Sequence, residues 1–313
     1  MARNRVRPER ARGRMTQADT SAKKTRELKR GLHSRHLQMI AIGGAIGTGL
    51  FLGSGGTISQ AGPGGALLAY AAIGIMVLFV MQSLGELSTH LPVAGSFHTY
   101  GSRYVSPAFG FAMGWNYWFN WAITLAAELV AAGVIMSFWL PDVPSWIWAA
   151  VFLALLTGLN FLSARAFGEG EFWFSAIKVT AVLLFLILGV LMIAGIIGGR
   201  SPGFSNWTTG EAPFVGGWMS IISVFMIAGF SFQGTELVGV AAGESKDPRR
   251  DMPRAIRTVF WRIMLFYIGA IVVIGFLLPY TDPSLLASAD NSDITASPSP
   301  SSSNAPASPW PQA

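Results

Sequence analysis

Two short glycine-broken stretches decide the fold of this chain: GGAIGTGLF at Gly43 to Phe51, and AGFSFQGTE at Ala228 to Glu236. Each interrupts an apolar run long enough to cross a lipid bilayer, which takes about 20 helical residues. Unpaired backbone groups are very unfavourable in lipid, so such a break persists only where protein buries it or where it lines a cavity. A pair of breaks therefore predicts a binding site for a transported solute.

The composition around these breaks is that of an integral membrane protein. Hydrophobic residues make up 51% of the 313 residues and charged residues only 12%. Residues 1–36 hold twelve Lys and Arg against three acidic residues, a local net charge of +9, and the rest of the chain carries −3. A basic tail can bind nucleic acid, but beside a long apolar segment it favours a cytoplasmic anchor, and we expect no nucleic-acid partner.

Seven apolar spans are predicted, at 37–60, 66–88, 108–139, 146–163, 172–198, 217–242 and 255–279. The first exceeds the usual apolar core of a signal peptide, about 7 to 15 residues, so we expect it to be retained. The loops after spans two, four and six contain Arg103, Arg165, Lys246, Arg249, Arg250, Arg254 and Arg257, whereas those after spans one, three and five contain only Arg200. This asymmetry predicts a multi-pass protein of the cell membrane with a cytoplasmic N-terminus.

The sequence divides into four parts: a basic cytoplasmic tail at 1–36, a transmembrane core of helices 1 to 7 at 37–279, an outer loop at 280–298, and a Ser/Pro-rich tail at 299–313. The last part cannot form a packed core and is typical of disorder. A TCN serine codon read one base earlier has T in the middle and encodes an apolar residue. Because serine residues are frequent after Pro298, we hypothesise a frameshift there, either real or a sequencing error. A separate hypothesis is that translation starts at Met15 instead of Met1, with the Arg-rich stretch before Met15 as upstream sequence.

Several stretches resemble the amino-acid permeases of the amino acid, polyamine and organocation superfamily, and in particular the lysine-specific permeases of bacteria. The resemblance runs from about Glu27 through at least Leu286. It is carried by Arg35 to Leu37, Met39 to Phe51, Thr57 to Ala66, Ser83 to Leu87, Gly110 to Trp121, Phe167 to Glu169, Ser205 to Trp207, Gly229 to Glu236 and Ala241 to Ser245.

The resemblance implies an all-α membrane fold of twelve helices, the first ten forming two inverted repeats with helices 1 and 6 broken. Seven of these helices are present here. It also implies a proton symporter that imports a cationic amino acid, lysine first, by alternating access, with protons, lysine and membrane lipid as partners and no cofactor. We expect this shortened form to be inactive. The alternatives are a permease for another amino acid, aromatic or general, a non-transporting membrane remnant, and a seven-helix receptor.

The two breaks offer backbone groups that match both ends of an amino acid. Amide groups at Gly47, Thr48 and Gly49, at the start of a half-helix, suit a carboxylate. Carbonyl groups near Ile42, Gly43 and Ala45, and near Ser231, suit an ammonium group. The alternative is that these glycines are close-packing positions between helices. The predicted substrate-binding residues are Ile42, Gly43, Ala45, Gly47, Thr48, Gly49, Tyr117, Trp121, Phe230, Ser231, Gly234 and Glu236.

Glu128, Glu236 and Lys178 lie well inside predicted spans, where charge is unfavourable and is expected to face a partner or water. Glu236 is predicted to meet a substrate ammonium or to take part in proton coupling, with structural pairing as the alternative. Tyr117, Trp121, Thr124 and Glu128 share one helical face and could hold a cationic side chain, with Glu128 recognising its charge. Aromatic packing is the alternative for this stripe.

Lys178 lies near the inner end of span five, where a lysine can extend to the membrane surface. The resemblance instead implies that Lys178 takes the place of a coupling sodium ion and takes part in proton coupling. Phe230 is implied to close the site over the substrate, while Phe232 is expected to pack. Neither a catalytic constellation nor a metal site is predicted: the chain has no Cys, and His33, His36, His90 and His98 form no convincing set.

Overall fold

The computed structural model describes residues 34–44, 46–93, 95–161, 164–199, 201–241, 245, 247–283 and 285–286. The predicted N-terminal tail up to residue 33, Ala45, Lys246 and the Ser/Pro-rich tail lie outside these residues. Within them the chain is helical and has no strand, which confirms the predicted all-α class. Its elements are α2 (Ser34–Gly43), α3 (Thr48–Phe51), α4 (Gly53–His90), α5 (Ser96–Tyr104), α6 (Pro107–Trp139), α7 (Ser145–Asn160), α8 (Ala164–Ile193), α9 (Ser205–Thr208), α10 (Gly217–Ser231), α11 (Leu237–Ala241), α12 (Pro248–Arg262), the π-helix η2 (Ile263–Ile268) and α13 (Gly269–Leu277).

Four helices of the described chain are long and apolar enough to cross a membrane, at Gly53–His90, Pro107–Ser137, Glu169–Ile193 and Arg249–Leu277. The other predicted spans correspond to shorter apolar helices: span one to α2 and α3, span four to α7, and span six to α10. The helix of span five ends at Ile193 instead of 198, and the starts of two spans also differ from the structure. The helix of span five begins at Ala164 instead of 172, and that of span seven at Pro248 instead of 255, because polar first turns carry no hydropathy signal.

The predicted loop between spans one and two, residues 61–65, is reduced to one residue. Gly62, with φ +75° and ψ 167°, is the non-helical position inside α4, and Pro63 restarts the helix after it. The chain reverses at Gly62. Before the reversal, a Cβ on Gly53 would touch Ile227 near the C-terminal end of α10, and Gly62 itself lies against Pro213, which precedes the N-terminal end of α10. After the reversal, Tyr70 returns to Ser231, the last residue of α10. The two halves of α4 therefore lie along α10 as a hairpin.

Both predicted helix breaks are present. The first separates α2 from α3 at residues 44–47, and the second separates α10 from α11 at residues 232–236. The two meet in the interior, where Ser231 Oγ donates a hydrogen bond to the carbonyl of Gly49 at 2.7 Å. Tyr70 Oη lies 2.9 Å from the same hydroxyl. Spans one, two and six are thus joined at the level of the breaks.

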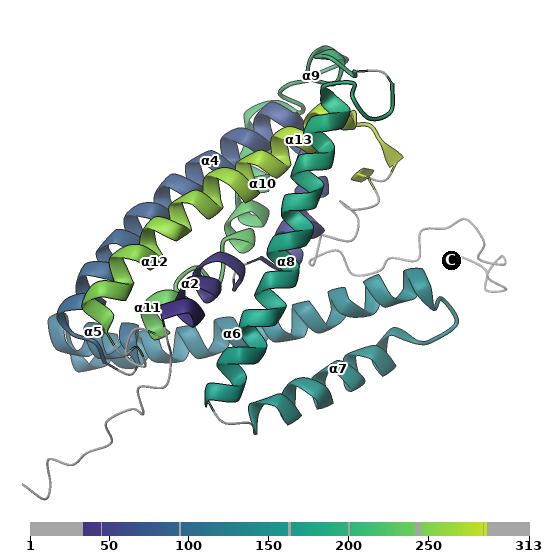
Figure 1. Cartoon of the computed structure of the whole chain (residues 1–313). Helices are drawn as coiled ribbons and strands as arrows, with labels where there is room; N and C mark the ends of the chain where they lie inside the picture. Colours follow the sequence, from purple (N-terminus) through teal and green to yellow (C-terminus); the bar gives the residue numbers. More distant parts are fainter. Residues whose placement is uncertain are drawn as a thin grey trace, which may run out of the picture.

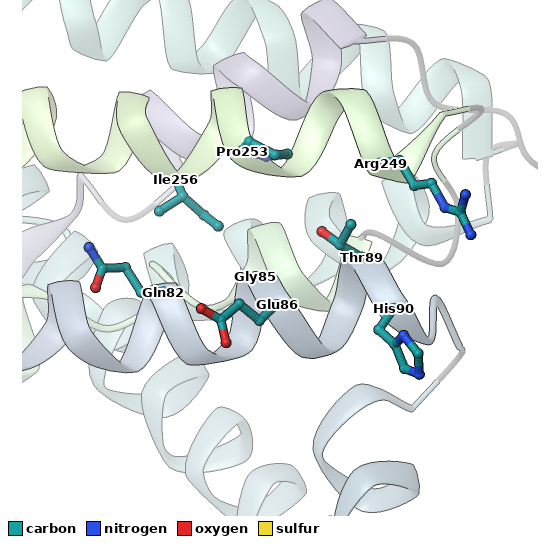
Figure 2. Close-up of a pocket in the computed structure, with 8 residues that line it drawn as sticks. All are labelled: Gln82, Gly85, Glu86, Thr89, His90, Arg249, Pro253 and Ile256. Atoms are coloured by element: carbon teal, nitrogen blue, oxygen red, sulfur yellow. The ribbon is translucent and has the colours of Figure 1, made fainter.

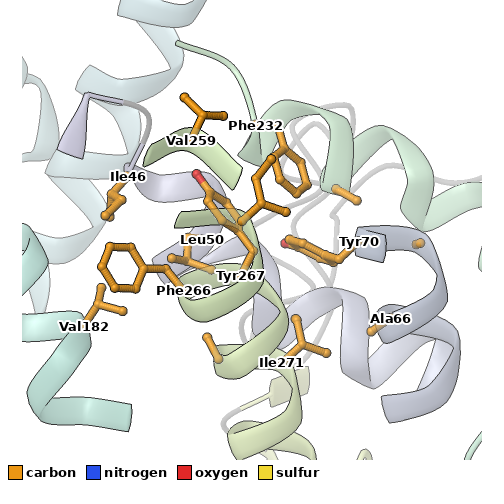
Figure 3. Close-up of a cluster of buried hydrophobic side chains, with 14 of the residues drawn as sticks. Ile46, Leu50, Ala66, Tyr70, Val182, Phe232, Val259, Phe266, Tyr267 and Ile271 are labelled. Carbon is orange, nitrogen blue, oxygen red and sulfur yellow. The ribbon is translucent and has the colours of Figure 1, made fainter. Parts of the chain in front are cut away.

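The core lies where α4, α10 and the helix from α12 to α13 surround the broken segments (Figure 1). Tyr70, Phe232, Phe266 and Tyr267 fill its centre together with aliphatic side chains from these helices and from α8 (Figure 3). Phe232 is 3% exposed and stacks on Tyr267 with ring centroids 4.4 Å apart, so the expectation that it packs is confirmed.

The helices α6 and α7 form a hairpin that extends away from this core (Figure 1). Their sequences are mostly apolar, and many large side chains on them are exposed, among them Phe111, Trp115, Trp118, Trp139 and Trp146. Lipid tolerates such a surface, because a membrane helix gains nothing by hiding apolar side chains from hydrocarbon.

Candidate functional site

A cavity of about 210 Å³ opens where the two breaks meet. Cavities for drug-sized ligands usually hold about 300–1,000 Å³, so this one suits a smaller metabolite. Both breaks, α6 and α8 contribute to its wall. The residues that line it are Gly44, Ile46, Gly47, Gly49, Trp121, Thr124, Glu128, Lys178, Phe230, Ser231 and Gln233.

The first break brings backbone close to an acidic side chain of α6. Thr48 Oγ1 donates to Glu128 Oε1 at 2.8 Å. A Cβ on Gly47 would lie 3.1 Å from the same oxygen, so glycine at this position leaves room for the carboxylate. The start of α3 carries the positive end of a short helix dipole, which favours a negative group. Glu128 therefore places negative charge at this end of the cavity, which suits an ammonium group of a ligand.

The second break supplies both backbone and an amide side chain. Gln233 Nε2 donates to Thr124 Oγ1 at 2.6 Å, which joins the break to α6 across the cavity. Gly234 has φ +87°, a conformation that glycine adopts without strain. Its N–H donates to Glu236 Oε2 at 2.9 Å, so the Glu236 side chain folds back onto its own turn.

Seven of the predicted site residues lie together in the cavity wall: Gly47, Gly49, Trp121, Glu128, Lys178, Phe230 and Ser231. Six others lie outside the lining: Ile42, Gly43, Thr48, Tyr117, Gly234 and Glu236. Thr48 still touches the site through Glu128. Ala45 lies outside the described residues.

The predicted aromatic stripe of α6 divides between two places. Trp121, Thr124 and Glu128 line the cavity. Tyr117, one turn earlier, instead packs on Phe97 with ring centroids 5.4 Å apart and donates to Glu236 Oε1 at 3.4 Å. Tyr117 and Glu236 thus form a pair next to the second break, just behind Trp121 of the cavity wall, whose ring centroid lies 6.3 Å from that of Tyr117.

Gly43 has a packing role. It is buried, and a Cβ on it would lie 2.3 Å from the Cβ of Ser175 on α8, so only glycine permits α2 and α8 to come this close. Gly49 is in a similar position against Ser231, at 2.6 Å from its Cα. At Gly43 the close-packing alternative therefore fits the contacts, while Gly49 both packs and lines the cavity.

Sequence reasoning missed Gln233, Tyr70 and Arg262. Gln233 is a polar side chain inside a break, which is itself a signal of function in a membrane span. Arg262 gave the same signal, because it is a charged residue in the apolar span seven. Nothing in the local sequence of Tyr70 indicates its contact with Ser231, 161 residues further along the chain.

A larger hollow of about 670 Å³ lies between the C-terminal end of α4 and the N-terminal half of α12 (Figure 2). It is open to the surface, and Gln82, Glu86, His90 and Arg249 on its rim are exposed. None of its lining residues belongs to either break. Size alone does not make it the substrate site, because it lacks the unpaired helix ends that the smaller cavity has.

Comparison with known proteins matches residues 36–309 to the family described as amino acid permease. The chain is similar to the lysine-specific permease of Escherichia coli (strain K12), with 61% identity over 90% of this chain and 58% of that protein. It is also similar to two proteins of Lactococcus lactis subsp. cremoris. The lysine-specific permease is 54% identical over 83% of this chain and 52% of its own length, and the histidine permease 55% identical over 83% and 55%. The chain thus spans about half the length of these relatives.

Proposed function

Because this chain belongs to the amino acid permease family, we propose that it carries the substrate site of a proton-coupled importer of a cationic amino acid, with lysine as the first candidate. The relatives are permeases, which supports a role in transport instead of catalysis. The observation that carries the substrate proposal is the cavity between the two breaks, which Glu128 and Trp121 line together with backbone of both broken helices.

The chemistry of this cavity supports an amino acid with a positively charged side chain. Backbone groups at Gly47 and Gly49 on one break and at Phe230 and Ser231 on the other can pair with the α-carboxylate and α-ammonium groups. A second ammonium group would be attracted by the Glu128 carboxylate and by the face of the Trp121 ring. Phe230 would cover the bound substrate.

Proton coupling needs a group that exchanges a proton within reach of the substrate. Lys178 meets the geometric requirement, since it lines the same cavity as Glu128. Glu236 is the second candidate, because it sits in the turn of the second break and contacts Tyr117 of α6. Substrate and proton would then be released together when the two breaks open toward the cytoplasm.

The relatives also support a second substrate. A histidine permease is 55% identical to this chain, nearly the same as one of the lysine-specific permeases. Histidine shares the amino-acid backbone with lysine but places its ring nitrogens nearer to Cα than the lysine ammonium. Competition between the two amino acids is therefore the decisive measurement.

The test is equilibrium binding of tritiated lysine to the purified 313-residue chain in lipid nanodiscs, read by scintillation proximity. Unlabelled lysine, arginine, histidine, phenylalanine and norleucine compete in parallel. We expect lysine to compete best and norleucine, which lacks only the side-chain ammonium, to compete at least about tenfold less well, since a charged hydrogen bond contributes about 1.5–3 kcal/mol. Stronger competition by histidine than by lysine would assign the site to histidine, and stronger competition by phenylalanine would assign it to an aromatic substrate.

A further inference from the structure

Span seven changes its winding where it passes the two breaks. It continues from α12 through the π-helix η2 into α13, and Arg262 and Tyr267 stand at the two ends of the π-helical turn. Side chains five residues apart come to lie on one face in this geometry, because a π-helix has i to i+5 hydrogen bonds. Both residues are buried, with exposed fractions of 2% and 0%.

Arg262 bridges the inner half of span one and the second break. One guanidinium nitrogen donates to the carbonyl of Ala41, and the other donates to Thr235 Oγ1. Ala41 is in the last turn of α2, whose carbonyl groups have no partner within the helix and carry the negative end of its dipole. A cation at this place is therefore favoured, and its planar fork can serve two oxygens at once.

The Nε–H of Arg262 has no hydrogen-bond partner among the described residues. A buried arginine with one donor unpaired, and with neutral oxygens as the acceptors of both hydrogen bonds described above, is retained at a cost in desolvation. The end of the α2 dipole and the nearby Glu236 carboxylate both favour the charge of Arg262, so the unfavourable part of the arrangement is the unpaired Nε–H. The hydrogen bonding of Arg262 therefore depends on the position of α2. If α2 moved away with the Ala41 carbonyl, Thr235 Oγ1 would be the one acceptor left of these two.

Tyr267 binds the second break on the side that contacts α3. Its hydroxyl donates to the carbonyl of Ser231 at 2.9 Å, and its ring stacks on Phe232 beside Tyr70 (Figure 3). Ser231 in turn donates to the carbonyl of Gly49, so this contact reaches α3, the outer half of span one. One face of span seven thus holds α3 through Tyr267 and α2 through Arg262.

We propose that Arg262 is a positioning residue that holds α2 to the second break and so acts as a latch. In this proposal, α2 separates from α8 and α11 only when the hydrogen bond between the Arg262 guanidinium and the Ala41 carbonyl breaks. The non-helical residues between α2 and α3 allow α2 to move while Tyr267 keeps α3 in place. The proposal rests on the proposed function for its meaning: in a carrier, release of α2 opens the cavity toward the side of the N-terminus.

The absence of cysteine permits a site-specific measurement of this movement. Ser175 is fully buried on α8 and faces Gly43 of α2, so Ser175→Cys reports separation of α2 from α8. Ser88 is equally buried at the end of α4, and Ser88→Cys reports general loosening. Each reporter is combined with Arg262→Met, with Arg262→Lys and with Arg257→Met, an exposed arginine on the same helix. The readout is the rate of labelling by N-ethylmaleimide in nanodiscs.

We expect Arg262→Met to raise the labelling rate at residue 175 by about tenfold or more, the factor that corresponds to losing one hydrogen bond to a charged group. Arg262→Lys should raise it by about threefold, because a single ammonium cannot hold both oxygens as the guanidinium fork does. Arg257→Met should leave it unchanged, and none of the three should change labelling at residue 88.

Equal rates at residue 175 with and without Arg262→Met would overturn the latch, as would a parallel rise at residue 88. If Arg262→Met does not yield folded protein, Arg262→Lys decides alone, and a rate equal to the parent refutes the proposal. Lysine binding by the parent chain is measured separately. A chain that fails to bind lysine but shows the tenfold effect refutes the proposed function and leaves the latch standing.

Discussion

At the scale of single residues, two glycines of the broken spans differ in what a methyl group would meet. A Cβ on Gly49 would lie 2.6 Å from Ser231 Cα, whereas nothing lies within 4 Å of a Cβ on Gly229. We predict that Gly49→Ala lowers the free energy of unfolding by about 1–3 kcal/mol through overpacking. Gly229→Ala, the matched control, should be neutral or stabilising by up to about 1 kcal/mol. Thermal unfolding of both variants in one detergent measures the difference, and equal midpoints would contradict it.

Glu128 is the residue whose charge should matter most for binding. Glu128→Gln keeps an oxygen that can accept from Thr48 but removes the negative charge from the cavity wall. We predict that lysine affinity falls at least about tenfold, because a charge-assisted hydrogen bond is replaced by a neutral one. Norleucine affinity should change less than lysine affinity.

The matched control for this prediction is Glu86→Gln, which removes the same charge from an exposed position on α4. It should leave lysine binding unchanged. Equal lysine affinity of Glu128→Gln and the parent chain in the scintillation assay would show that Glu128 does not contact the substrate.

At the scale of elements, Glu236 in the turn between α10 and α11 could either stabilise this turn or bind the substrate, and its contacts favour the first role. Its carboxylate accepts from the N–H of Gly234 and from Tyr117, and it lies outside the cavity lining. We predict that Glu236→Gln keeps lysine affinity at neutral pH within about threefold, since the amide retains an acceptor of the same shape. Glu236→Ala should lower the unfolding free energy by about 1–3 kcal/mol, because buried donors of the turn lose their acceptor.

Binding and unfolding measurements on the two Glu236 variants complete this test. A large loss of lysine affinity in Glu236→Gln, with an unchanged unfolding midpoint, would contradict the structural role and favour contact of Glu236 with the substrate. Lysine affinity of the parent chain and of Glu236→Gln, measured across a range of pH, then tests whether substrate binding is linked to a proton on Glu236.

The elements were predictable from sequence to the extent that local chemistry determines them. Glycine clusters inside apolar runs located both breaks, because unpaired backbone at membrane depth persists only where protein buries it or a cavity solvates it. The turn within α4 was predicted as a loop of several residues, and only its length was wrong, since a single non-helical Gly62 before Pro63 makes the reversal. Contacts such as Tyr70 with Ser231 and Arg262 with Ala41 join distant parts of the chain, and no periodicity encodes them.

At the scale of the whole molecule, the proposed orientation can be read from the two ends of α7. The lysine and arginine asymmetry between loops predicts that Asp142, before α7, faces outward and that Phe161, after it, faces the cytoplasm. Both side chains are exposed. In the cysteine-free background, Asp142→Cys should react with a membrane-impermeant maleimide in intact cells, and Phe161→Cys should react only after the membrane is permeabilised.

Extraction with alkaline carbonate supplies the control for membrane integration. A multi-pass chain with the apolar helices of this structure should remain in the membrane fraction and dissolve only in detergent. Labelling of Phe161→Cys in intact cells together with protection of Asp142→Cys would invert the proposed topology.

The π-helical turn of span seven has a further consequence for how the molecule is held together. An α-helix advances about 100° per residue, and a π-turn accommodates roughly one residue more than the α-helix around it. The extra residue sets the rotational phase between α12, which meets α2, and α13, which packs along α8 and α4. If Ile263–Ile268 were wound as an α-helix with no residue removed, Arg262 and Tyr267, five residues apart, would point about 140° away from each other, and only one of them could face the breaks.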